Sequence, residues 1–237
     1  MQYLKLKIKL LIIFCGDMLT LRFFKFSKPE KEKTNFPYAV SVEQKIMPSA
    51  TFENKIFNLQ YAADKINKHI VKPNQIFSFW QIVGNPNRSL KKSRSIRNGE
   101  IANETGGGLC QISGIVYHIS ILGGLEIVER HNHSVDIYQE HERFTPLGTD
   151  ATVVYGNRDL RIKNNFDFPI KFEIDVKGNR LIVKLLSSNK IAVKHLIFVE
   201  KADGDYKIVD VFDNRNQLVN RSKYLKSPTL PYPMLRT

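Results

Sequence analysis

Three consecutive glycines, residues 106–108, lead directly into an apolar segment with helical periodicity. At about 100° per residue, the apolar side chains of this segment fall on one stripe, made of Leu109, Ile112, Ile115, Val116, Ile119 and Leu122. Such a stripe is stable only when it is buried against other elements. We therefore expect a helix from Leu109 to Leu122 that packs into the core and ends at Gly123 and Gly124.

The other segments predict an α+β fold with a mainly antiparallel sheet and one or two packed helices. Apolar residues recur at three- and four-residue steps from Phe52 to Ile70, which indicates a second amphipathic helix that ends before Pro73. Runs rich in β-branched and aromatic residues are expected to form strands: Gln75 to Val83, Leu125 to Val128, Ala151 to Tyr155, Asp159 to Lys163, Ile170 to Val176, Arg180 to Leu186, 194–201 and 206–212. Residues 177–179 (Lys-Gly-Asn) predict a hairpin turn.

Composition divides the chain into three parts. Residues 1–49 form a basic and apolar N-terminal segment with a charged linker at 27–35, residues 50–187 form the main domain, and residues 188–237 form a strand-like extension. The apolar run from Leu10 to Cys15 is much shorter than the ~20 residues that span a bilayer, and Phe14 does not fit a lipoprotein cleavage site. We expect a cytoplasmic protein or one attached peripherally to an anionic membrane.

Basic side chains outnumber acidic ones by 36 to 23, which gives a net charge of +13. This excess favours anionic surroundings such as a membrane face, a cell-wall polymer or nucleic acid, or reflects only a solvated basic surface. Nucleic acid is the weakest of the possible partners, because the chain has no recognition motif and the basic residues are scattered, apart from Lys91, Lys92, Arg94 and Arg97.

Cys110 lies in the first turn of the predicted helix, almost opposite its apolar stripe. A free thiol has a pKa near ~8.5, and the positive end of a helix dipole favours the reactive thiolate. Glycines before a helix can point their amides inward because no Cβ stands in the way. The amides of Gly107, Gly108 and Cys110 are therefore candidates for an oxyanion hole, in which one donor is typically worth ~3–4 kcal/mol.

Two histidines follow the next predicted strand, and either could act as the base that a cysteine nucleophile needs. His131 and His133 alternate with Asn132 and Ser134, so both imidazoles are expected on the same side. We favour His133, because His131 lies at the strand end beside charged residues. Asp150, Asp159 or a backbone carbonyl could orient the imidazole.

Other interpretations of these residues remain open. The glycine turn before Cys110 can serve tight packing alone, and one cysteine with two histidines can bind zinc. No second cysteine or paired carboxylate supports a metal site, and no phosphate loop or dinucleotide motif indicates a cofactor, so we expect neither. Cys15 lies in a segment of different character from Cys110, which argues against a disulfide.

Several separated motifs together resemble the VanW family over roughly residues 50–170. They are Asn74 to Trp80 preceding Arg97 to Gly99, Gly106 to Ser113, Glu129 to Ser134, and Asp150 to Arg161. VanW proteins are linked to glycopeptide-resistance clusters, and VanW domains have been connected to cysteine-dependent L,D-transpeptidation in peptidoglycan. The resemblance thus implies a VanW domain at 50–187, with further candidates for positioning roles in Gln111, Ser113, Arg130, Asp150, Tyr155 and Asp159.

The leading hypothesis is an acyl-transferase in which Cys110 attacks a peptidoglycan stem peptide or its precursor and forms a thioester. An acceptor amine then resolves the thioester, while His133 or His131 moves the proton. The alternative is a non-catalytic accessory module that holds an anionic envelope polymer or wall precursor and in which Cys110 is structural.

Overall fold

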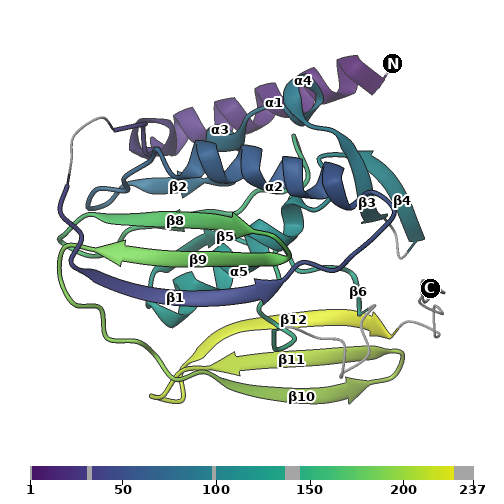
Figure 1. Ribbon diagram of the computed structural model, residues 1–237. Helices are drawn as coiled ribbons and strands as arrows, with labels where there is room; N and C mark the ends of the chain where they lie inside the picture. The colour runs from purple at the N-terminus through teal and green to yellow at the C-terminus, as the bar shows by residue number, and fades with distance from the viewer. Residues whose placement is uncertain (1, 31–33, 98–99, 137–144, 227–237) are drawn as a thin grey trace.

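The structure, a computed structural model, describes residues 2–30, 34–97, 100–136 and 145–226 (Figure 1). Its fold is α+β with mainly antiparallel sheets, as the sequence predicts. The main sheet has the order β1-β9-β8 and consists of β1 (Tyr38–Lys45), β8 (Ile170–Lys177) and β9 (Arg180–Ser187). The hairpin turn predicted at residues 177–179 joins β8 and β9.

Both predicted helices pack against the main sheet. Helix α2 (Phe52–Ile66) contacts β8, and α5 (Leu109–Leu122) contacts β1, β9 and α2. The inward side chains of the sheet, among them Phe172, Val183 and Leu185, are fully buried with them. The outward face is polar, and there Lys184 pairs with Glu173 at 3.1 Å. Alternation of this kind places one face of an antiparallel sheet on the core and the other in water.

Helix α5 is buried on nearly all sides. Five of the six stripe residues are buried, and Leu122 is half-buried. Tyr117, on the face shared with Cys110, is also buried, and its hydroxyl is hydrogen-bonded to Asn220 of the C-terminal extension. The extension therefore covers part of the face opposite the stripe.

The C-terminal extension supplies three of the four strands of a sheet with the order β10-β11-β12-β6. Strands β10 (Ile197–Asp203) and β11 (Tyr206–Phe212) were expected, whereas β12 (Leu218–Lys226) was not. Strand β6 (Val135–Asp136) belongs to the main part of the chain and runs parallel to β12. The sheet of the C-terminal extension thus includes the short segment that follows His133.

Two shorter sheets complete the fold. Strands β2 (Ile76–Ser78), β7 (Arg161–Lys163) and β5 (Glu126–Glu129) form a sheet of order β2-β7-β5. Strands β3 (Lys92–Arg97) and β4 (Glu100–Thr105) form a hairpin that was not expected from the sequence. The short helix α4 (Pro86–Ser89) precedes this hairpin.

Several predicted boundaries were wrong. The strand expected from Gln75 to Val83 ends at Ser78, because the Ser78 hydroxyl accepts the Gln81 amide and caps helix α3 (Phe79–Val83). Residues 151–155 form no strand, and only an isolated bridge joins Val154 to Arg158. The second helix ends at Ile66 rather than Ile70.

The N-terminal segment is a helix, α1 (Gln2–Leu19), followed by a 3-10 turn, η1 (Arg22–Lys25). One side of α1 packs on the domain: Leu6 lies over Gly156, where an added Cβ would come within 2.5 Å of its side chain. The other side exposes both lysines and large apolar residues. Among the helices of the described residues, none has the length and hydrophobicity needed to cross a membrane.

Candidate active site

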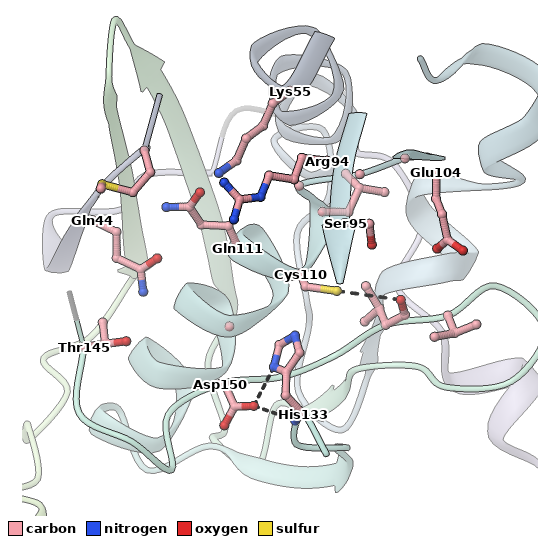
Figure 2. A pocket seen from close by; sticks show the side chains of 18 of the residues that line it. Gln44, Lys55, Arg94, Ser95, Glu104, Cys110, Gln111, His133, Thr145 and Asp150 are labelled. Atoms are coloured by element: carbon pink, nitrogen blue, oxygen red, sulfur yellow. Dashed lines mark hydrogen bonds and ion pairs between the residues drawn. The ribbon is translucent and has the colours of Figure 1, made fainter. Parts of the chain in front are cut away.

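A cavity of about 350 Å³ opens at the N-terminal end of α5. Its walls come from the end of β1, the β3-β4 hairpin, the glycine turn, the segment after β5 and residues 145–155. Cys110, His133 and Asp150 lie together on one side of this cavity (Figure 2). Residues far apart in the sequence thus meet around Cys110, the nucleophile that the sequence predicts.

Cys110, His133 and Asp150 form a connected relay. His133 Nδ1 lies 2.7 Å from Asp150 Oδ2, and the His133 backbone amide donates to the same oxygen at 2.7 Å. The other ring nitrogen is directed toward Cys110 (Figure 2), and the imidazole is close enough to lower the pKa of the thiol. The carboxylate therefore fixes both the orientation and the tautomer of the imidazole, an arrangement also found in known cysteine and serine acyl-transfer sites.

The electrostatics of the relay favour a charged thiolate–imidazolium pair. Burial raises the pKa of the Cys110 thiol, but the hydrogen bond and positive charge of His133 outweigh it, so that the pKa lies below its usual value. Burial lowers the pKa of His133, yet Asp150 and the thiolate raise it to about 10. The pKa of Asp150 falls to about 2, because His133 and Arg130 outweigh its burial. The relay therefore shifts Cys110 toward its thiolate form, which is the reactive form of a cysteine.

Arg130 and Tyr224 hold the other oxygen of Asp150. Arg130 donates to Asp150 Oδ1 at 3.0 Å and to its backbone oxygen at 2.8 Å, and it reaches Ser222 of β12 at 2.6 Å. The Tyr224 hydroxyl, also on β12, donates to Asp150 Oδ1. Burial and the nearby carboxylate raise the pKa of Tyr224, so it remains a donor at neutral pH. The aspartate is therefore fixed on both of its oxygens.

The C-terminal sheet also holds the backbone around His133. The Leu225 amide donates to the Ser134 carbonyl at 2.8 Å, and Asn132 Nδ2 donates to the Lys223 carbonyl at 2.9 Å. Both contacts flank His133 in sequence. Residues 218–226 thus complete a site whose reactive groups lie in the main domain, and no motif in the sequence signalled this contribution.

The glycine turn has two different uses. The Gly107 amide donates to the Glu104 carbonyl at 3.0 Å, and an added Cβ at Gly107 would lie 2.2 Å from the Ser93 carbonyl oxygen. Gly107 therefore serves close packing against β3, and its amide is occupied. Within the described residues, no acceptor takes up the amides of Gly108 or Cys110. These two are the remaining candidates for an oxyanion hole.

Ser113 and Gln111 tie α5 to its surroundings. The Ser113 hydroxyl donates to the Ala151 carbonyl at 2.6 Å and so fixes the segment after Asp150 against the helix. Gln111 Nε2 donates to the Lys45 carbonyl at the end of β1, at 2.8 Å. Thr152 places its hydroxyl 3.6 Å from Cys110 Sγ. The bond from Ser113 and the contact from Thr152 both tie residues 151–152 to α5.

The other candidates lie apart from the relay. His131 pairs with Glu129 at 3.1 Å, and it follows the end of β5, so the two histidines do not share one side of a strand. Asp159 is buried in a separate network with Ser78 and Arg161. Tyr155 lines the cavity and packs edge-to-face on Trp80, with ring centroids 5.4 Å apart. Among the described residues, no group of three His, Cys, Asp or Glu could hold a metal ion.

Comparison with known proteins covers the same region. Residues 54–186 match the family model described as VanW like protein. The uncharacterized protein YoaR of Bacillus subtilis is 34% identical over 141 residues, which are 59% of this chain and 45% of that protein. The vancomycin B-type resistance protein VanW of Enterococcus faecalis is 29% identical over 167 residues, 67% of this chain and 61% of that protein. The chain thus spans about half of these relatives, and no solved structure matches it.

Proposed function

The chain belongs to the VanW family, and we propose that it is a cysteine-dependent acyl-transferase acting on peptidoglycan stem peptides, in the manner of an L,D-transpeptidase. The observation that carries the proposal is the relay of Cys110, His133 and Asp150 on an open cavity. A thiolate held by an oriented imidazolium is the arrangement that covalent acyl transfer requires. The name of the Enterococcus relative supports a link to glycopeptide resistance.

Each group of the relay has a defined task in the proposed reaction. The Cys110 thiolate attacks the carbonyl carbon of an L,D-peptide bond, and the amides of Gly108 and Cys110 stabilise the oxyanion. The His133 imidazolium gives its proton to the departing amine as the C–N bond breaks, which leaves a thioester on Cys110. An acceptor amine then attacks the thioester, the neutral His133 takes its proton, and the thiolate is released. Asp150 keeps the imidazole oriented through both steps.

Detection of the thioester tests this proposal. We expect a covalent adduct when the protein meets a stem tetrapeptide whose last bond joins an L-centre to a terminal D-amino acid. The mass of the protein should rise by the mass of the donor less the mass of the free D-amino acid that is released. Cys110→Ala should form no adduct, His133→Ala should form it far more slowly, and His131→Ala serves as the matched control. Absence of an adduct on a protein whose Cys110 alkylates rapidly would contradict the proposal.

An anionic membrane surface is proposed as a second partner, through α1. The helix exposes Leu4, Leu11 and Ile12, each at least 60% accessible, beside the exposed lysines 5, 7 and 9. Apolar side chains next to lysines suit the interface of an anionic bilayer. We expect the protein to sediment with vesicles that contain anionic lipid and not with neutral ones. Leu11→Glu with Ile12→Glu should abolish the binding, and equal binding to both vesicle types would contradict it.

A further inference from the structure

Two cations from different elements meet on the cavity wall that faces Cys110. Lys55 comes from α2 and Arg94 from β3, and both line the cavity. Figure 2 shows the Lys55 ammonium and the Arg94 guanidinium pointing toward one another beside the head of Gln111. His133 lies on the other side of Cys110 in this view. We call Lys55 and Arg94 the cationic corner.

The fold holds the cationic corner in place. Gly108 lies under the Lys55 side chain, since an added Cβ there would come within 2.7 Å of Lys55 Cγ. The Arg94 amide donates to the Thr51 hydroxyl at 2.9 Å, and Thr51 also contacts Ser93 at 3.1 Å. These bonds join the start of α2 to β3, so the two elements present their cations in a fixed relation.

The charge of Lys55 has no counter-ion in the part of the chain that the structure describes. Lys55 is half-buried, and burial together with the nearby charge of Arg94 lowers the pKa of Lys55 to about 8. Glu104 also lines the cavity, but Figure 2 shows its carboxylate well away from the corner. A half-buried ammonium that has no counter-ion is costly unless an anion joins it.

We propose that the cationic corner binds the free terminal carboxylate of the acyl donor. This inference rests on the proposed function and specifies its substrate class. When the bond under attack is the last one of a stem peptide, the leaving residue carries a free carboxylate only one residue beyond the reacting carbonyl. That carboxylate then has to lie in the same cavity as Cys110, and the cationic corner is its complement. Donors that are amidated or extended at this end would be bound less tightly.

Binding to an inactive variant tests the carboxylate subsite separately from catalysis. In Cys110→Ala protein, calorimetry compares a stem tetrapeptide that has a free C-terminal carboxylate with its C-terminal amide. We expect the acid to bind at least about tenfold more tightly than the amide. Lys55→Met should remove most of this preference. Lys45→Met is the matched control, because Lys45 lines the same cavity outside the corner, and it should keep the preference.

Each outcome decides the inference. Equal affinity for acid and amide, binding of neither, or a preference unchanged in a folded Lys55→Met variant would overturn it. The acid–amide comparison needs no variant of the corner, so it remains decisive if Lys55→Met does not fold. If the thioester forms equally fast from the acid and from the amide, the acyl-transferase proposal holds and the carboxylate subsite is ruled out. If the acid binds tightly but wild-type protein forms no thioester, the subsite holds and the acyl-transferase proposal is ruled out.

Discussion

Two networks of charged side chains in this protein use the same residue types for different functions. In the site network, Asp150 is held by Arg130 and in turn holds His133, which faces Cys110. In the second network, Arg161 bonds both Asp159 and Asp17 of α1. The site network ends on a thiol in an open cavity. The second reaches His131 through Glu129, which lies 3.3 Å from Arg161, and in the described residues no side-chain bond joins this network to Cys110.

The comparison shows what turns a buried carboxylate into part of a proton relay. The Asp159 carboxylate accepts hydrogen bonds from Ser78, the Trp80 amide and Arg161. Burial has the largest influence on the pKa of this carboxyl and raises it. Asp150 has a titratable imidazole as its partner instead, and its pKa falls to about 2. A carboxylate next to an arginine is therefore no sign of catalysis. The histidine and the space beside it make the difference.

Removal of the thiol should give the largest effect. Cys110→Ala should abolish thioester formation completely while the protein stays folded, because the lost side chain is small and its bonds to Thr152 and Val153 are long, at 3.6 and 3.9 Å. Mass spectrometry checks the loss of the donor adduct, and thermal unfolding checks that the variant stays folded. Adduct formation in the variant would place the nucleophile elsewhere.

Breaking the second network should affect stability and leave the chemistry intact. Arg161→Met removes one partner of a buried ion pair, in which the Arg161 and Asp17 side chains are 7% and 4% exposed. The unpaired carboxylates should cost about 3–5 kcal/mol of unfolding free energy. Denaturant unfolding measures the loss. The alkylation rate of Cys110 in the folded variant should match wild type, and a change in that rate would show that the two networks are coupled.

The link from the C-terminal sheet to the site network should give an intermediate effect. Tyr224→Phe deletes a hydrogen bond to a buried carboxylate, typically worth about 1.5–3 kcal/mol. Because the folded pKa of Asp150, about 2, lies below its usual 3.8, its stabilising contribution is present above pH 3.8 and is lost as the pH falls toward 2. Tyr224→Phe should move this loss to higher pH in acid-unfolding curves. An unshifted acid transition would remove Tyr224 from the network.

The smallest effect is expected at His131. Its imidazole bonds Glu129 rather than Cys110, so His131→Ala should change the Cys110 alkylation rate by no more than about twofold. Rapid-quench alkylation at pH 7 measures this rate. A loss comparable to that of His133→Ala would make both histidines part of the relay.

The sequence predicted the parts of the fold whose signal is local. The stripe of α5, the periodicity of α2 and the alternation of β8 and β9 each follow from neighbouring residues, and the structure confirms these elements. The prediction of a strand at 151–155 was wrong because contacts with distant residues, rather than local propensity, decide its structure. Its residues have strand propensity, but their backbone bonds go to α5 and to the His131 carbonyl. Tertiary contacts decide such a segment.

The same limit applies to the site. The glycine turn and the two histidines identified Cys110 and its neighbourhood, because those residues cluster in two short motifs. Tyr224 and Lys55 gave no signal, since each enters the site from an element distant in the sequence and only the fold brings it there. Asp159 fitted a role that Asp150 occupies in the structure, and nothing in the sequence separates two aspartates nine positions apart in one motif.

The pH dependence of Cys110 alkylation tests the central claim most directly, in a Cys15→Ser background that removes the exposed second thiol. A thiolate paired with an imidazolium should react at a nearly constant rate from neutral pH up to about 10, where His133 loses its proton. In His133→Ala the rate should instead rise steeply with pH toward an ordinary thiol pKa near ~8.5. A wild-type profile that already rises in that way, and that His133→Ala does not alter, would contradict the account.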